Sequence, residues 1–222
     1  MPEKIPWPFT RLYDKYPNRI FVKWFERIAM NIKDGHISGS IVDIGTGPGR
    51  LPIEIAKRVE NAEVVGIDLS EDMVNIAKRN AKKAGLADRV KFKLASAYNT
   101  GFEDNSIDLV VSTGMIHHLK EPIRAFNETY RILKPGGEAW IYDGCKDVTK
   151  TEFEETVRSL GIKGDLPLPL WIIERMWPHW HVGYKTEVYV SGKIGRAIEE
   201  SLFKSHDIKK EGAYIRIRLK KT

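Results

Sequence analysis

A glycine-rich segment and two aspartates carry the residue types and spacing best suited to chemistry in this sequence. Asp43-Ile-Gly45-Thr-Gly47-Pro-Gly49 follows a β-branched run, and a helical pattern begins directly after it. At the carboxyl edge of a parallel sheet, glycines let the backbone approach a ligand closely, and a helix N-terminus offers free N–H groups. Asp68 ends the next β-branched run, where a carboxylate can accept both hydroxyl groups of a ribose. Together these residues indicate a nucleoside-containing cofactor.

The spacing of the glycines separates two kinds of nucleoside cofactor. A dinucleotide fingerprint requires G-x-G-x-x-G/A, but Arg50 stands at the third position here, and its side chain would crowd a pyrophosphate. The G-x-G-x-G pattern after an acidic residue instead resembles motif I of the class I S-adenosylmethionine-dependent methyltransferases. The resemblance covers roughly residues 36–145 and implies S-adenosyl-L-methionine (AdoMet) as the cofactor.

Four further segments resemble later motifs of the same family. They are VVGIDLS (64–70), GFEDNSIDLVVS (101–112), MIHHL (115–119) and RILKPGGEAWIYD (131–143). The second of them departs from the family pattern, because glycine and isoleucine replace its proline and phenylalanine.

The resemblance also implies which residues bind the cofactor. Ser96 stands where many members have an aspartate that bonds the adenine amino group, so that contact is open. Asp43 and Thr46 have an alternative role in shaping the loop. The cofactor-binding residues expected from the resemblance are Asp43, Gly45, Thr46, Gly47, Gly49, Asp68, Leu69, Ser96, Ala97 and Ser112.

His117 and His118 are the candidate catalytic residues, because the resemblance places their segment beside the transferred methyl group. The sulfonium of AdoMet is already activated, so methyl transfer depends mainly on positioning the acceptor. A base is needed only when the acceptor arrives protonated, and imidazole suits that task because it titrates near neutrality. The alternative is that the histidine pair only supports its loop.

Aromatic residues outside the core are the candidate substrate contacts. Tyr13 and Tyr16 resemble the N-terminal tyrosines that fold over AdoMet in many members, with ordinary packing as the alternative. Trp171, Trp177 and Trp180 lie in a segment that also holds His179 and His181, without a nearby carboxylate or cysteine partner. Because Cys145 is the only cysteine, neither a disulfide nor a metal site is expected.

The elements that position these residues follow from periodicity and turn residues. Five short β-branched runs alternate with amphipathic helical patterns, which predicts a parallel, doubly wound sheet with right-handed crossovers. Ser70 is expected to cap a helix that ends near Ala84. The expected strands are Ser40–Gly45, Glu63–Asp68, Val90–Ala95, Ile107–Ser112 and Glu138–Asp143, and the expected helices of the core are Leu51–Val59 and Pro122–Leu133.

The fold class is therefore α/β, a Rossmann-like, doubly wound sheet completed to seven strands by a C-terminal antiparallel hairpin. A helix begins near Asn18, a helix spans Lys193–Phe203, and alternation in 213–220 predicts the hairpin. We expect one methyltransferase domain over 1–222. Its parts are an N-terminal helical cover (1–36), an AdoMet-binding core (37–145), a substrate lid (151–190), and a last helix with the hairpin (191–222).

Positive charge is segregated from the expected core. Residues 41–150 hold 16 basic and 16 acidic side chains, whereas the last 21 residues hold 7 basic and 2 acidic ones. Such flanks can neutralise phosphates, and the tryptophans can stack an exposed base. This pattern slightly favours methyl transfer to an N or O nucleophile of RNA, such as a ribosomal or transfer RNA base. Against it, Ser112-Thr113-Gly114-Met115 lacks the [D/N/S]-P-P-[Y/F/W] motif of many base N-methylating enzymes.

Two alternatives to an RNA acceptor remain open. The patterns around 101–119 resemble methyltransferases of quinones, sterols and small amines, and the apolar segment 167–177 suits a quinone-, lipid- or amine-like acceptor. A non-catalytic assembly factor that binds AdoMet is the third possibility. The charge itself has a further explanation as a solubility or thermostability trait.

Location and assembly are less strongly indicated by the sequence. No apolar run approaches the length of a membrane span, and the N-terminal residues lack a hydrophobic signal core. We therefore expect a cytoplasmic protein without a membrane span, and the sequence leaves its oligomeric state open.

Overall fold

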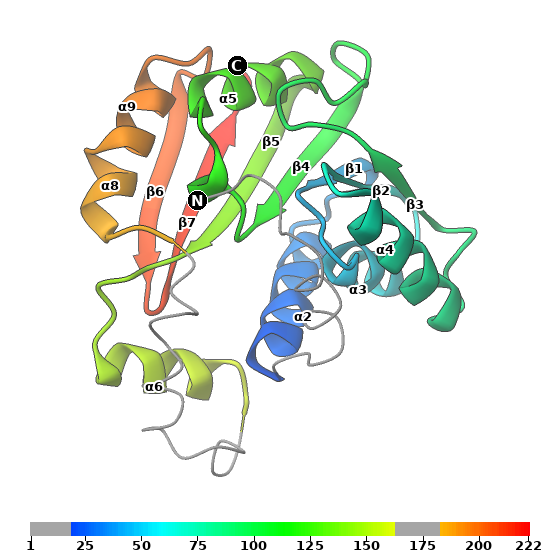
Figure 1. Cartoon of the computed structure of the whole chain (residues 1–222), viewed down its shortest axis with the longest axis horizontal. Helices are drawn as coiled ribbons and strands as arrows, with labels where there is room; N and C mark the ends of the chain where they lie inside the picture. Colours follow the sequence, from blue (N-terminus) through cyan, green and yellow to red (C-terminus); the bar gives the residue numbers. More distant parts are fainter. Residues whose placement is uncertain (1–18, 163–182) are drawn as a thin grey trace.

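A mixed seven-stranded sheet forms the centre of the molecule (Figure 1). The computed structural model describes residues 19–162 and 183–222. The strand order β3-β2-β1-β4-β5-β7-β6 confirms the expected fold class, including the antiparallel hairpin. The strands are β1 (Gly39–Ile44), β2 (Ala62–Asp68), β3 (Val90–Leu94), β4 (Ile107–Thr113), β5 (Leu133–Gly144), β6 (Ser205–Glu211) and β7 (Tyr214–Lys220).

The chain reverses its direction of winding between β1 and β4. From β1 it proceeds outward through β2 to β3, then returns to the other side of β1 and continues through β4 to β5, all in parallel. Ligands of open α/β sheets bind beyond the carboxyl ends of the strands at such a switch point. The topology therefore places the glycine segment after β1 at the expected ligand edge.

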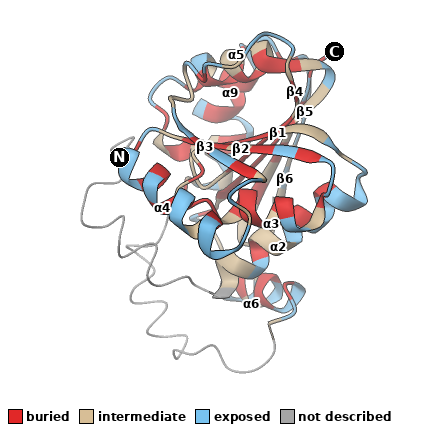
Figure 2. Ribbon diagram, turned by 90° about the vertical axis from the view of Figure 1, so that its right-hand side faces the viewer, coloured by how far each residue is buried: buried red, intermediate tan, exposed pale blue. Residues whose placement is uncertain are grey.

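Two layers of helices bury the two faces of the sheet, and Figure 2 shows buried residues on the strands and the inward sides of the helices. One apolar cluster joins the sheet to three helices through residues such as Trp24, Ile55 and Ala77. The other includes Phe126 and Ile198. The first face carries α2 (Arg19–Asp34), α3 (Arg50–Arg58) and α4 (Glu71–Lys83), and the second carries α5 (Pro122–Ile132), α8 (Thr186–Val190) and α9 (Lys193–Glu199).

The boundaries of two elements differ from expectation for local reasons. Helix α9 ends at Glu199 rather than Phe203, because the Ser201 hydroxyl donates to the Ile198 carbonyl and accepts from the Phe203 N–H. Strand β5 begins at Leu133, the last residue expected in the preceding helix, rather than at Glu138, and its pairing with β4 shifts register between Ile107 and Leu109.

Helix α6 (Lys150–Ser159) occupies part of the range expected to be a lid. A capping box starts it: the Thr149 hydroxyl accepts from the Glu152 N–H, and the Glu152 carboxylate accepts from the Thr149 N–H. Its Thr156 hydroxyl accepts from the Ala213 N–H in the turn of the C-terminal hairpin. This part of the range is therefore a helix docked on the hairpin, while 163–182 lies outside the described residues.

Candidate active site

The glycine loop between β1 and α3 is shaped by two different requirements. Gly47 has a φ of +53°, and a Cβ added there would meet no atom within 4 Å. Gly49 has a φ of +76°, and its Cβ would lie 2.7 Å from the Phe92 ring and 2.8 Å from the Ala77 side chain. Gly49 therefore lets the loop pack on the layer beneath it, whereas Gly47 leaves open space where a ligand can approach the backbone.

Asp68 is held at the mouth of this loop by two backbone donors. The Gly47 N–H donates to its Oδ2 at 2.8 Å, and the Ser70 N–H donates to its Oδ1 at 2.8 Å. A carboxylate oxygen can accept more than one hydrogen bond. The half-buried carboxylate is therefore fixed in advance and is able to accept a pair of neighbouring hydroxyl groups.

Asp43 lies buried beneath the loop, at 1% exposure. Neither of its carboxyl oxygens has a hydrogen bond of good geometry to another described residue. Desolvation raises the pKa of this carboxyl to about 7, against the opposing effect of the Thr46 hydroxyl and with a smaller repulsion from Asp68. A buried acid without firm partners beside the ligand edge fits either a cofactor contact or a role in loop shape.

Two exposed leucines stand at the carboxyl ends of the neighbouring strands β2 and β3. Leu69 is 44% exposed after β2, and Leu94 is 57% exposed at the end of β3. Ser96 and Ala97 follow on the same side, with the Ser96 hydroxyl accepting from the Tyr98 N–H at 3.2 Å. Exposed apolar side chains around a half-buried turn suit the flat face of a base. The sequence did not indicate Leu94, because strand alternation places it in phase with the buried Val90 and Phe92 and so predicts a buried side chain.

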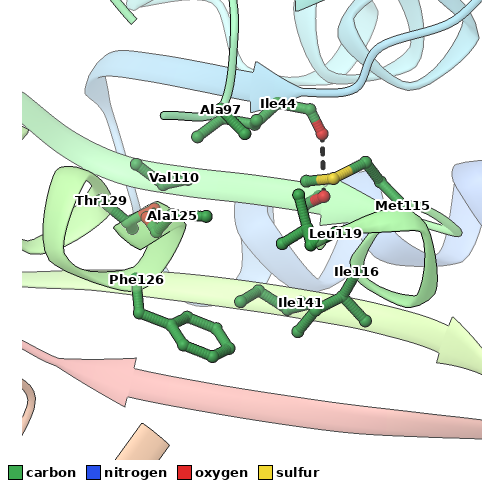
Figure 3. Close-up of a pocket in the computed structure, with 11 residues that line it drawn as sticks. Ile44, Ala97, Val110, Met115, Ile116, Leu119, Ala125, Phe126, Thr129 and Ile141 are labelled. Atoms are coloured by element: carbon green, nitrogen blue, oxygen red, sulfur yellow. Dashed lines mark hydrogen bonds between the residues drawn. The ribbon is translucent and has the colours of Figure 1, made fainter. Parts of the chain in front are cut away.

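Ser112 holds two strands together at the switch point. Its buried hydroxyl donates to the Ile44 carbonyl at 2.8 Å, so it links the ends of β4 and β1. Figure 3 shows the apolar cavity beside it, which has a volume of about 20 Å³. That volume suits no more than a water molecule, so this cavity is too small for a cofactor or a methyl acceptor.

The two histidines follow β4 on the short helix η1 (Ile116–His118). The ring of His117 is fully buried, and its Nδ1 lies 2.8 Å from Oδ1 of Asp143 at the end of β5. The half-buried ring of His118 lies with its centroid 4.0 Å from that of His117. Asp143 was not identified from the sequence, because its partner lies 26 residues away and no spacing rule links the two.

The structure thus brings most of the expected site residues to one edge of the sheet. The loop after β1, Asp68 after β2, Ser96 after β3 and η1 after β4 all follow carboxyl ends of parallel strands. Tyr13, Tyr16 and the residues at 171, 177 and 180 lie outside the described residues, as do the two histidines at 179 and 181. Within the described ranges, no group of three or more His, Cys, Asp or Glu side chains could hold a metal ion.

Comparison with known proteins assigns the residues that form this edge to a family. Residues 41–137 match a family model described as a methyltransferase domain. Residues 41–137 form a class I methyltransferase domain. The cofactor of this domain is AdoMet, and the open approach at Gly47, the fixed Asp68 carboxylate and the exposed leucines fit its nucleoside.

Relatives and solved structures agree with this assignment. The methyltransferase domain is similar to phosphoethanolamine N-methyltransferase 1 of Arabidopsis thaliana, with 33% identity over 60% of this chain and 26% of the relative. It is also similar to the ubiquinone/menaquinone biosynthesis C-methyltransferase UbiE of Geotalea daltonii, with 32% identity over 48% of this chain and 46% of that protein. The matched parts thus span less than half of either relative.

A crystal structure from Methanococcus maripaludis, assigned as an S-adenosyl-L-methionine-dependent methyltransferase, resembles nearly the whole chain. It superimposes with a TM-score of 0.75 and 27% identity, and the match covers 96% of this chain and 92% of that one. Among the described residues, no helix combines the length and apolar character needed to cross a bilayer.

Proposed function

We propose that the chain transfers the methyl group of AdoMet to a small-molecule acceptor. One observation carries this choice. Several basic side chains near the C-terminus contact acidic, aromatic or carbonyl groups of the protein itself. An RNA acceptor, which the charge pattern of the sequence favours, would need those side chains free to meet phosphates.

Several basic side chains in and next to the hairpin have partners inside the protein. Arg216 pairs with Asp207 at 3.2 Å and with Glu211 at 3.1 Å. The guanidinium of Arg218 lies 4.1 Å from the ring centroid of Trp140. Lys221 is only 9% exposed, and its ammonium donates to the Asn105 side chain at 2.8 Å and to a backbone carbonyl at 2.7 Å. These contacts within the protein account for the basic residues without a nucleic-acid partner.

A second support comes from the other basic flank and from the relatives. Lys23 pairs with Glu26 one turn further along α2. Arg27 donates to the Ser159 carbonyl at the end of α6 and so links the two helices. The names of the relatives refer to phosphoethanolamine and to quinones, which are small molecules. None of the relatives described above is named for an RNA substrate.

The chemistry assigned to the site needs few groups. AdoMet supplies an activated methyl group when bound. The loop after β1 and Asp68 hold the nucleoside, and η1 lies at the end of β4, where the acceptor would approach. When the acceptor nitrogen or oxygen carries a proton that must leave, His117 or His118 takes it. The aromatic residues Tyr13, Tyr16, Trp171, Trp177 and Trp180 stay predicted substrate contacts.

The acceptor class is tested by supplying tritiated AdoMet together with three probes: phosphoethanolamine, a demethylated menaquinone and total RNA. We expect label in a small-molecule probe and none in RNA. Asp68→Ala is the control, because label that this variant still incorporates does not depend on the cofactor site. Label in RNA that depends on Asp68 would contradict the proposal. AdoMet binding without transfer to any probe or to a cellular small-molecule extract would favour the non-catalytic alternative.

A further inference from the structure

A buried pair of side chains joins η1 to the end of β5. Nδ1 of His117 lies 2.8 Å from Oδ1 and 2.9 Å from Oδ2 of Asp143, and both side chains are 0% exposed. The backbone N–H of His117 donates to Oδ2 at 3.0 Å, and that of Gly144 donates to Oδ1 at 2.9 Å. Donors thus surround the carboxylate of Asp143, which fixes its orientation.

This geometry determines which ring nitrogen of His117 carries the proton. A carboxylate only accepts hydrogen bonds, so the proton of the neutral ring lies on Nδ1 and the lone pair on Nε2. Nε2 is buried and has no hydrogen-bond partner among the described residues. Leaving such an atom unsatisfied costs about 1–3 kcal/mol, and native proteins retain one mainly where it has a use. The lone pair of Nε2 is therefore open to a bound water or to a ligand that donates a hydrogen bond.

The segment that holds His117 has contacts on two sides, with the cofactor loop and with Tyr184. The side chain of Met115, at the start of the same turn, packs against the cofactor loop, where a Cβ on Gly45 would lie 2.5 Å from it. On the other side, the Tyr184 hydroxyl donates to the His117 carbonyl at 3.0 Å. Tyr184 follows closely after 163–182, the range that holds the candidate substrate tryptophans. His117 thus lies between the cofactor loop and Tyr184.

We propose that Asp143 is a positioning residue that fixes the tautomer of His117, and that Nε2 of His117 takes the proton of the methyl acceptor. The inference rests on the proposed function and selects His117 over His118. An electron pair of the acceptor forms the new bond to the methyl carbon, while the electrons of the broken C–S bond stay on sulfur and leave S-adenosylhomocysteine. The acceptor proton moves to Nε2, and the resulting imidazolium is stabilised by the Asp143 carboxylate.

Two substitutions separate this role from a purely structural one. His117→Asn places an amide N–H where Nδ1 lies, so it keeps a donor for Asp143 but removes Nε2. Asp143→Asn offers an N–H to Nδ1 and thereby moves the ring proton to Nε2. Asp147→Asn is the matched control, because Asp147 accepts from the Thr186 N–H at 2.9 Å outside the pair.

The first readout separates kcat from cofactor binding, using the small-molecule probes described above. We expect both His117→Asn and Asp143→Asn to bind AdoMet with unchanged affinity and to lose at least about 100-fold in kcat, with Asp147→Asn near wild type. Circular dichroism checks the fold of each variant. If Asp143→Asn does not fold, His117→Asn decides, and near-normal kcat in a folded His117→Asn overturns the inference.

The second readout needs no acceptor. Ring ¹⁵N NMR of histidine-labelled protein at about pH 8 should show His117 protonated on Nδ1 in the wild type and on Nε2 in Asp143→Asn. A wild-type ring protonated on Nε2 overturns the inference whatever the transfer assay shows. Failure of the wild type to methylate any acceptor refutes the proposed function and the role of Nε2 together, whereas normal transfer by His117→Asn refutes the inference alone.

Discussion

Two aspartates at the ligand edge differ in how they are held. Backbone N–H groups fix the carboxylate of Asp68, whereas the carboxyl of Asp43 is buried without firm hydrogen bonds. Asp68 is fixed by the N–H groups of Gly47 and Ser70, so binding a ribose needs little reorganisation. Asp43 lacks firm partners and is forced toward its neutral form by burial. Preorganised groups reduce the entropy cost of binding, whereas a buried acid reduces stability wherever it must ionise.

The buried carboxyl of Asp43 makes stability depend on pH. Its pKa is about 7 in the folded chain and 3.8 ordinarily, so the folded state binds more protons between these values. The free energy of unfolding therefore falls as pH rises from about 4 to about 7, by up to about 4 kcal/mol from this group. Asp43→Asn should remove that fall and be more stable than the wild type at about pH 8.

Urea unfolding of both proteins at several pH values measures this effect. The difference in unfolding free energy between Asp43→Asn and the wild type should grow as the pH rises from about 4 to about 7 and stay constant above that range. Asp72→Asn, at the exposed start of α4, controls for the loss of a carboxylate. A difference that stays constant across the pH range would show that the Asp43 carboxyl is not forced toward its neutral form.

At the scale of elements, Gly49 lies where three elements of the core meet. It precedes α3 and touches the Phe92 ring of β3 and the Ala77 side chain of α4. The loop after β1 therefore lies on its neighbours without space for a methyl group. Gly47, two residues earlier in the same loop, faces open space, and this contrast allows a matched pair of substitutions.

Gly49→Ala should lower the unfolding free energy by about 2–4 kcal/mol, because a left-handed backbone and overpacking both oppose it. Gly47→Ala should cost about 1 kcal/mol, from backbone conformation alone, while still obstructing the ligand. Urea denaturation of both variants compares the two costs. Equal destabilisation would contradict the packing role assigned to Gly49.

At the scale of the whole molecule, local patterns in the sequence predicted most of the sheet. Strands β1 to β4 appear within a residue or so of their β-branched runs, and Ser70 caps α4 as expected. The motif spacing also predicted the edge where the glycine loop and Asp68 meet. These features depend on neighbouring residues, so a sequence displays them directly.

Contacts between distant residues were the part that the sequence could not predict. Asp143 and His117 meet only because β4 and β5 are adjacent, and Lys221 reaches Asn105 across 116 positions. The basic hairpin therefore looked available for phosphates until the partners of its side chains were known. Helix α6 was missed because the range 151–190 was interpreted from its tryptophans and prolines rather than from the capping box at Thr149.

Calorimetric titration of AdoMet tests the assigned cofactor edge most directly. The wild type should bind AdoMet, and Asp68→Ala should weaken binding by about 100-fold, through loss of two charge-assisted hydrogen bonds to the ribose. Glu63→Ala, at an exposed position of the same strand, should bind like the wild type. Equal affinity of the wild type and Asp68→Ala, or no binding by the wild type, would contradict the assignment of this edge to the cofactor.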